Sequence, residues 1–343
     1  MNILVSSLTV LLAGAIGFAA HRANLCTVRA VQEILSNRRA HILMSFLKTS
    51  LWVVGVTYLV SWGLQFDLAA TKNLNFSSQS ILGGLLFGAG ATINRGCAFS
   101  TLTRLGSGNL GMVTSLLGFL IGSSAYGLTT VAGLTNPAIV RISSMPNKEW
   151  AVPISMALAG WMTWELVKLL SSPDSKINWR QRLLAPHYRL STAAMIMGFS
   201  NAIIYLMIGA WSYTLLFGQT TRHVVLGMST PPNILWVLFL ALIGGIGLSA
   251  WQSHRFRWQW QPQWRWVSYC TGGVLMGFGA GAIPGGNDAL IMNGLPSLSP
   301  HAAPTFLAML AGIAVTLMVM RRLGQNIPPI DCSSDLCLRE PGT

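Results

Sequence analysis

The chain has 343 residues, of which 52% are hydrophobic and only 9% are charged, whereas about 25% of the residues in a typical soluble domain are charged. Its mean hydropathy is +0.53, and together these values exclude an ordinary soluble domain and predict a polytopic membrane protein. The 22 lysines and arginines outnumber the 9 acidic residues. Such an excess is typical of nucleic-acid-binding proteins, but in a membrane protein it determines orientation.

Long hydrophobic runs define the predicted membrane spans. A helix needs about 20 mainly apolar residues to cross a bilayer, and nine runs of this sequence are close to that length or longer. They lie near residues 3–20, 41–63, 79–95, 108–132, 150–168, 191–216, 233–251, 268–285 and 302–320. We therefore predict an all-α fold with about nine transmembrane helices.

The positions of the basic residues predict how the chain is oriented. If the carboxyl terminus is cytoplasmic, only Lys72, Arg141, Lys148 and Arg222 of the 22 basic residues lie outside. Because short basic loops stay in the cytoplasm, we expect an inner-membrane protein with an external amino terminus. The first run could also be a signal peptide, but no lysine or arginine precedes Arg22, and signal peptides begin with a basic region.

A glycine-rich segment occurs twice in the chain. Residues 83–97 and residues 272–286 align without a gap and are identical at 7 of 15 positions, with Cys97 aligned to Gly286. Small residues let helix backbones approach closely. The recurrence therefore predicts a duplicated membrane unit in which helices break before a functional turn.

An odd number of predicted spans separates equivalent elements, so the second unit is expected to be inverted relative to the first. Inverted repeats of transporters bring broken helices together near the bilayer midplane. The stretches after Cys97 and Gly286 are too short to cross the bilayer and are predicted to be half-helices or re-entrant turns. Residues 221–231, which include Gly227, are expected to correspond to residues 22–31.

The repeat predicts a division of the chain into four parts. These are a first membrane repeat, an unpaired helix with a basic cytoplasmic linker, an inverted second repeat and a disordered cytoplasmic tail, at residues 1–135, 136–190, 191–325 and 326–343.

Cys26 and Cys97 are the candidate functional thiols. A lone cysteine in a membrane helix is commonly a small packing residue. These two differ because Cys26 follows Arg22, and Cys97 follows Arg95 and Gly96, in each case at a predicted helix break. Backbone N–H groups at a helix start and neighbouring guanidinium groups favour an anion, so the two breaks are candidate stations for an anionic substrate.

Arg95 allows two interpretations. It is either an interfacial arginine that extends to the membrane surface or an intramembrane ligand for an anion. In the second copy, Gly285 and Gly286 are followed by Asn287 and Asp288. These two polar residues are candidate partners of Arg95 across the pseudo-twofold axis.

Three further features have simpler interpretations. The tryptophans and arginines at residues 255–266 join two spans, and we interpret them as an interfacial belt beside anionic lipid and not as a nucleic-acid surface. Cys270 is interpreted as packing. Cys332 and Cys337 could bind a metal or meet a redox partner, but two thiols without a histidine make a weak metal site. No P-loop occurs, so no nucleotide cofactor is expected.

Three stretches together resemble the YeeE/YedE family of sulphur-transport membrane proteins. They are Gly17-Phe18 with Arg22-Ala23-Asn24-Leu25-Cys26, residues 83–97 followed by residues 101–111, and residues 272–286. The resemblance covers nearly the whole chain. It implies an hourglass-shaped inner-membrane protein that takes up thiosulfate, in which cysteines at the constriction pass the ion inward through S–H···S hydrogen bonds. It also implies a small sulphur-carrier protein of the TusA type as a partner.

The family's inner cysteines match Cys26 and Cys97, whereas the outward-facing thiol expected at the end of the second copy is missing at Gly286 and Asn287. Asp288 stands near the place where an anion would enter, and a carboxylate there repels thiosulfate unless it is protonated or paired with Arg95. If the missing thiol weakens activity, Gly286→Cys is expected to raise thiosulfate use.

The leading hypothesis is uptake of a small sulphur-containing compound, thiosulfate first, with Cys26 and Cys97 as successive weak hydrogen-bonding stations. Two alternatives belong to other classes. One is a membrane thiol or persulfide transferase that uses Cys97, and the other is a non-transporting membrane subunit that recruits a sulphur-carrier protein.

Overall fold

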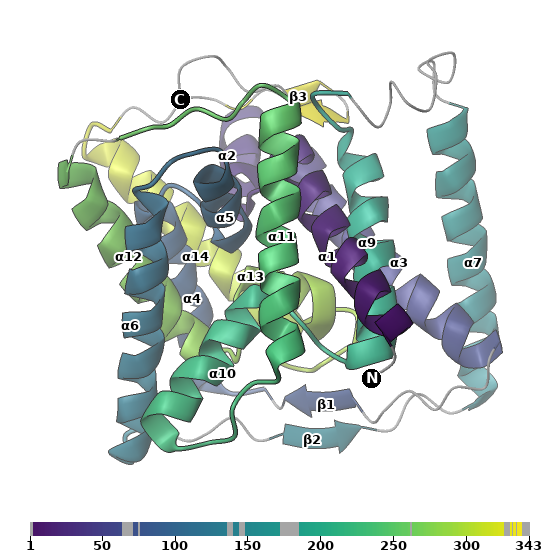
Figure 1. The fold of residues 1–343 in the computed structure, drawn as a ribbon, viewed down its shortest axis with the longest axis horizontal. Helices are drawn as coiled ribbons and strands as arrows, with labels where there is room; N and C mark the ends of the chain where they lie inside the picture. The colour runs from purple at the N-terminus through teal and green to yellow at the C-terminus, as the bar shows by residue number, and fades with distance from the viewer. Residues whose placement is uncertain are drawn as a thin grey trace.

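The computed structural model describes residues 3–63, 71–74, 76–135, 140–143, 148–171, 185–260, 263–325, 330, 332–333 and 335–337 (Figure 1). Nine helices of 16 or more residues make up most of these residues. They are α1 (Ile3–Ala23), α3 (His41–Gly63), α4 (Ser78–Ile93), α6 (Met112–Val131), α7 (Lys148–Leu170), α9 (Leu190–Ile208), α11 (Asn233–Gln252), α12 (Gln263–Ala282) and α14 (Ala302–Arg322).

The long helices coincide with the predicted hydrophobic runs, so the predicted all-α polytopic membrane fold is confirmed. Within the described residues, six segments are long and apolar enough to cross a membrane, or seven if the bent pair formed by residues 264–282 and 287–294 is counted. The number nine for membrane crossings stays a prediction. Large apolar side chains of α6, such as Ile121 (58% exposed) and Leu128 (59% exposed), face outward, as the lipid-facing surface of a membrane protein does.

Short elements complete the described structure. The short helices are α2 (Thr27–Asn37), α5 (Ala98–Gly106), α10 (Tyr213–Leu226) and α13 (Asn287–Ala289), which continues into the π-helical turn η2 (Leu290–Gly294). Each follows a long helix across a break in the chain. The strands β1 (Thr71–Leu74) and β2 (Val140–Ser143) form one antiparallel pair, and β3 (Cys332–Ser333) and β4 (Leu336–Cys337) form another.

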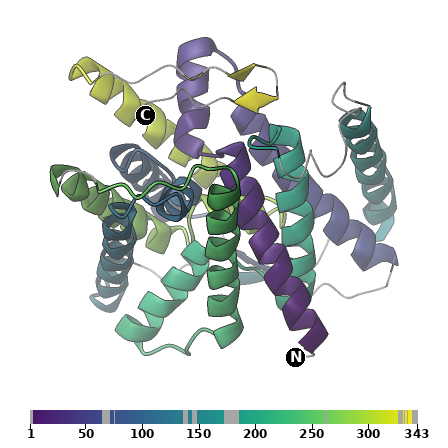
Figure 2. The same cartoon turned by 45° about the horizontal axis from the view of Figure 1, so that its top comes forward.

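The long helices form two groups. Helices α1, α3, α9 and α11 pack together in one group, helices α4, α6, α12 and α14 pack in the other, and α7 lies at the edge against α3 (Figure 1). The short helices α5 and α13 lie between the groups (Figures 1 and 2). The central breaks of the chain are therefore enclosed by long helices on both sides.

Glycines of the duplicated segment explain how closely α4 and α12 approach. A Cβ added at Gly83 would lie 2.7 Å from the Cβ of Ala282, and a Cβ added at Gly90 would lie 2.7 Å from the carbonyl oxygen of Gly272. Only glycine allows this separation. Because Gly83 meets the end of α12 and Gly90 meets an earlier part of it, the two helices run antiparallel.

The contacts between helices obey a twofold pattern. Each long helix of the first half has a counterpart in the second half: α1 and α9, α3 and α11, α4 and α12, and α6 and α14. When counterparts are exchanged, the packed pairs stay the same. The pair α1–α11 becomes α9–α3, and the pair α4–α14 becomes α12–α6, and all four pairs are in contact. The short helices follow the same exchange, because α2 contacts α14 as α10 contacts α6. Together with the antiparallel α4 and α12, this is the contact pattern that an inverted repeat requires.

The described part of the carboxyl-terminal tail differs from the predicted disorder. Cys332 and Cys337 form a disulfide that closes the β3–β4 hairpin, so within the described residues they are not free thiols. Asp335 accepts hydrogen bonds at Oδ1 from the backbone N–H (3.1 Å) and the hydroxyl (3.0 Å) of Ser191, so the hairpin is held at the first turn of α9. The expectation of a disordered tail is wrong for this hairpin, and the other residues of 326–343 lie outside the described residues.

Candidate functional site

The two candidate thiols lie at the starts of the two short helices of the first half. Helix α1 ends at Ala23, the chain turns through Asn24 with a left-handed φ of 51°, and Cys26 is the N-cap of α2. Helix α4 ends at Ile93, the chain turns through Arg95 with a φ of 57°, and Cys97 is the N-cap of α5. Neither cap side chain bonds its own helix, so both thiols are available to other groups.

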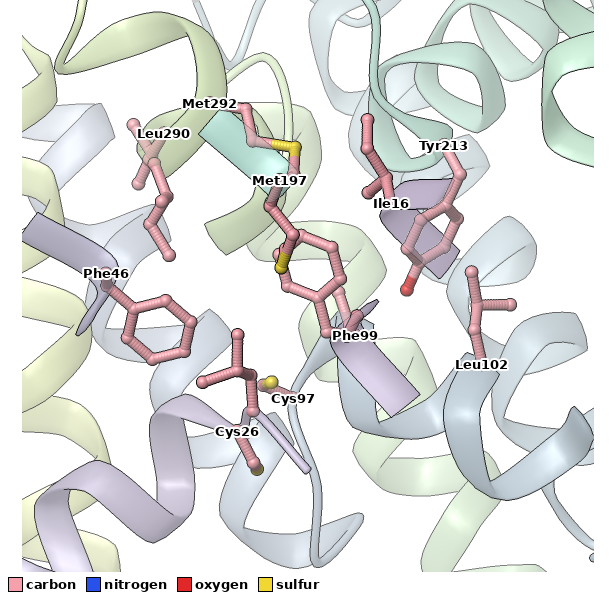
Figure 3. Close-up of a cluster of buried hydrophobic side chains, with 14 of the residues drawn as sticks. Ile16, Cys26, Phe46, Cys97, Phe99, Leu102, Met197, Tyr213, Leu290 and Met292 are labelled. Atoms are coloured by element: carbon pink, nitrogen blue, oxygen red, sulfur yellow. The ribbon is translucent and has the colours of Figure 1, made fainter. Parts of the chain in front are cut away.

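Cys26 and Cys97 lie next to each other in the centre of the protein. The backbone N–H of Thr27, the residue after Cys26 and the first residue of α2, donates to Cys97 Sγ at 3.3 Å, and both thiols belong to one buried cluster. Figure 3 shows the two sulphur atoms at one end of an apolar cluster that includes Phe46 and Phe99. The sequence placed the thiols 71 positions apart, and the structure joins them through the meeting of α2 and α5.

Solvent does not reach either thiol in this structure. Cys26 is 1% exposed and Cys97 is 0% exposed, and the neighbouring side chains in Figure 3 are apolar. The surrounding side chains thus exclude water from both sulphur atoms. Hydrogen bonds are stronger in such an environment than in water, and unpaired charge is more costly.

The end of the second glycine-rich copy meets the same place from the other half. Gly285 adopts a φ of 127°, and Gly286 is the N-cap of α13, as Cys97 is the N-cap of α5. Asn287 is fully buried and donates from Nδ2 to the hydroxyl of Thr27 at 2.9 Å. This contact links α13 directly to the helix that Cys26 begins.

Asp288 is the buried acid of the second half. It is 1% exposed, and its Oδ2 accepts the backbone N–H of Thr214 at 3.3 Å while its Oδ1 accepts the hydroxyl of Thr214. The backbone N–H of Gly286 also donates to that hydroxyl oxygen, at 2.8 Å. The carboxylate is therefore fixed at the start of α10.

The structure contains no room for the missing thiol at position 286. A Cβ added to Gly286 would lie 2.8 Å from Thr214 Cγ2 and 2.9 Å from Asp288 Oδ1. Atoms of Thr214 and Asp288 thus occupy the space that a cysteine side chain needs. The expectation that Gly286→Cys raises activity conflicts with this packing.

Three of the predicted site residues lie elsewhere. Arg95 is exposed, and within the described residues it forms no ion pair with Asp288. Its carbonyl oxygen accepts a hydrogen bond from Arg104 at 3.3 Å. The expected pairing of Arg95 with Asp288 is therefore absent. The left-handed turn directs Arg95 to the surface, whereas the Asp288 carboxylate binds Thr214 at the start of α10.

Arg22 is buried but does not face the thiols. Its guanidinium group donates to Ser249 Oγ at 3.0 Å, to Gln252 Oε1 at 2.9 Å and to the carbonyl oxygen of Ala185, and it lies 4.7 Å from the centroid of the Phe18 ring. Arg22 therefore joins the end of α1 to the end of α11 and to the segment before α9.

Gly227 is the left-handed C-cap of α10, with a φ of 64°. The helix that corresponds to α2 is α10, and it begins after Ser212. The expected match of residues 221–231 with residues 22–31 is wrong, because it aligns the end of one short helix with the start of the other. Gly96, unlike Gly227, lies next to a candidate thiol, because it directly precedes Cys97. A Cβ added at Gly96 would lie 2.7 Å from Ser100 Oγ.

Ser212, Tyr213 and Thr214 were not found by sequence reasoning. Ser212 is the N-cap of α10, and its hydroxyl accepts the N–H of Leu215. A serine that follows a hydrophobic run and a glycine is a signal for a helix start, so the signal existed. It was missed because the predicted span at residues 191–216 ran through the break that follows Ile208.

The sequence of the chain matches a known family. The profile of the sulphur transport family matches residues 22–315, a range that contains both thiols and both glycine-rich copies.

This chain belongs to the sulphur transport family. As a member of that family it is also similar to the thiosulfate transporter TsuA of Escherichia coli (strain K12), with 27% identity over 318 residues that cover 83% of this chain and 85% of the relative. The resemblance seen in the sequence is confirmed. Since the family and the relative are transporters and not enzymes, the chain is a multi-pass membrane transporter of a sulphur compound.

Proposed function

We propose that this protein takes up a small sulphur-containing anion, thiosulfate first, across the bacterial inner membrane, and that the anion passes the thiols of Cys26 and Cys97. The observation that carries this proposal is the meeting of the two buried thiols at the starts of two half-helices, where the N–H of the residue after Cys26 donates to Cys97 Sγ. The similar thiosulfate transporter supports the choice of substrate.

The thiol pair suits conduction of an anion through a narrow, dry passage. A thiol is a weak hydrogen-bond donor, and backbone N–H groups at the starts of α2 and α5 add partial positive charge. Because each contact is weak, an ion that enters can also leave, which a conduction pathway requires. Since both thiols are buried, passage needs the apolar side chains around them to move aside.

We further propose the orientation and the division into repeats that the sequence predicts. The basic loops place the carboxyl terminus in the cytoplasm, and the twofold pattern of helix contacts supports an inverted pair of membrane repeats at residues 1–135 and 191–325. In this orientation a TusA-like sulphur carrier would receive the sulphur compound on the cytoplasmic side.

Burial of the thiols favours transport over transfer of a persulfide. A transferase has to present its sulphur to an acceptor, but Cys26 and Cys97 are 1% and 0% exposed. A subunit that only recruits a carrier is distinguished by flux of thiosulfate into liposomes that contain this chain alone, because such a subunit gives none.

Sulphur-limited growth tests the role of Cys97. In a strain whose only thiosulfate uptake route is this protein, Cys97→Ala should abolish growth on thiosulfate while the amount of protein in the membrane stays normal. Cys270→Ala is the matched control, because Cys270 is a half-buried cysteine of α12 whose backbone packs against Gly118 of α6, and it should grow normally. Normal growth of Cys97→Ala would contradict the proposal.

A further inference from the structure

In the second half of the protein a carboxylate makes the kind of contact that a thiol makes in the first half. In the first half, Cys97 Sγ accepts the backbone N–H at the start of α2, 3.3 Å from Thr27 N. In the second half, Asp288 Oδ2 accepts the backbone N–H at the start of α10, 3.3 Å from Thr214 N. The two side chains thus make similar contacts with the starts of the two short helices, although one is a thiol and the other an acid two positions beyond Gly286, the residue that aligns with Cys97.

No cation of the described residues neutralises the charge of Asp288. Its partners include the hydroxyl and the backbone N–H of Thr214, and among the described residues its ion-pair partners include no lysine, arginine or histidine. Tyr213 of α10 lies close to Asp288 and also to Cys97 of α5, and tyrosine and cysteine are both neutral in their ordinary protonated forms. An ionised carboxylate is costly in such a place.

The helices packed around Asp288 have few other charges. Helix α4, whose Phe87 lies against Gly286, has no titratable side chain, and neither α13 nor η2 has one besides Asp288. The remaining titratable groups on its neighbours are Cys26, the N-cap of α2, Arg29 and Glu33 of α2, His41, Lys48 and Tyr58 of α3, Arg104 of α5, Arg222 and His223 of α10, and His301, Arg321 and Arg322 at the ends of α14. None of them pairs with Asp288.

A second buried group at this place has an open hydrogen-bonding position. Asn287 is 0% exposed, and its Oδ1 has no partner within the described residues, although its Nδ2 donates to Thr27. A buried acceptor of this kind is costly unless a ligand or a proton donor completes it. The open amide oxygen therefore belongs to a side chain that meets α2, and the carboxylate of the next residue is held at the start of α10.

We propose that Asp288 is a proton-binding site that couples entry of the anion to entry of a proton. This inference rests on the proposed function. Two negative charges close together in a water-excluded site disfavour each other, so an ionised Asp288 and a bound anion exclude one another. The anion therefore binds with the protonated acid, and by reciprocity the proton binds better when the anion is present.

The proposed cycle conserves charge and atoms. A proton from the outer side binds a carboxylate oxygen of Asp288, the anion passes the thiol pair, and the proton leaves to the cytoplasm, which restores the carboxylate. The benefit is electrical. Each negative charge moved inward against 100 mV lowers the attainable concentration ratio about 50-fold, and one accompanying proton removes one such factor for a dianion.

Uptake of labelled thiosulfate into proteoliposomes of the full chain tests the coupling at zero membrane potential. With the outside one pH unit more acidic, a coupled wild type should accumulate thiosulfate about 10-fold above the outside concentration. Asp288→Asn cannot carry the proton, so its accumulation ratio should not respond to the gradient. Asp335→Asn removes an acid of the tail hairpin and should respond as the wild type does.

A binding measurement covers the case in which Asp288→Asn transports nothing. In weakly buffered detergent solution, thiosulfate should cause the wild type to take up as much as about one proton per chain, and Asp288→Asn should take up none. Wild-type flux that is indifferent to the pH gradient, or a gradient response in Asp288→Asn, would overturn the proton site and leave the proposed transport intact. Wild type that neither binds nor moves thiosulfate would instead overturn the proposed function.

Discussion

Gly286→Ala is expected to destabilise the protein, because the new Cβ enters occupied space. It would lie 2.8 Å from Thr214 Cγ2, 2.9 Å from Asp288 Oδ1 and 3.1 Å from Phe87 Cε2. Gly286 has a φ of −96° and a ψ of −163°, which any residue adopts, so the cost comes from packing and not from the backbone. Forcing an additional group into a filled interior typically costs about 1–3 kcal/mol. The measurement is the unfolding transition of the purified protein in detergent.

A second substitution tests the reason for that cost. Thr214→Ser keeps the hydroxyl that binds Gly286 and Asp288 but removes Cγ2, the atom closest to the new Cβ. Gly286→Ala should therefore cost less in the Thr214→Ser background, with a coupling free energy on the order of 0.5–3 kcal/mol. The same cost in both backgrounds, or no cost in either, would refute the packing argument. Gly286→Cys meets the same obstruction and is not expected to raise uptake.

Two further predictions concern stability. Gly88→Ala should destabilise the contact of α4 with α14 by about 1–3 kcal/mol, because its Cβ would lie 2.2 Å from the carbonyl oxygen of Met309. In contrast, a Cβ at Gly160 in α7 meets nothing within 4 Å, so Gly160→Ala should stabilise its helix by as much as about 1 kcal/mol. Equal unfolding midpoints for the two variants would refute this prediction. Burial, and then Arg255 and Arg22, lower the pKa of His187, so the unfolded chain binds that proton more readily and stability should fall as the pH drops through about 6.5. His187→Gln should reduce this loss, and identical pH profiles of the melting temperature would contradict it.

The duplicated glycine segment shows how far sequence reasoning reached. Seven identities between residues 83–97 and 272–286 predicted two equivalent helices followed by breaks, and the structure has α4 with Cys97 after its break and α12 with Gly286 after its break. The prediction succeeded because close backbone contacts restrict these positions to glycine, and that restriction is visible in the sequence. Cys26 and Cys97 could also be identified from the sequence as candidate site residues, because each directly follows a predicted helix break.

The roles of the charged residues could not be obtained in that way. Arg22 and Arg95 both precede a thiol in the sequence, yet Arg22 binds the end of α11 and Arg95 is exposed. Asp288 was expected to meet an arginine and instead meets Thr214, 74 positions earlier. The direction of a long side chain at a turn depends on one or two backbone dihedral angles and on neighbours distant in the chain, which local sequence does not specify.

The amino-acid sequence by itself determined the membrane location, the positions of the long helices, the repeat and the two thiols, because hydrophobic length and glycine spacing are local physical requirements. Only the tertiary structure decided that α10 begins at Tyr213, that Cys26 and Cys97 lie next to each other, and that Thr214 and the Asp288 carboxylate fill the space beside Gly286. Those features arise where two halves of the chain meet, and contacts between segments far apart in the sequence are set by the packing of the whole molecule.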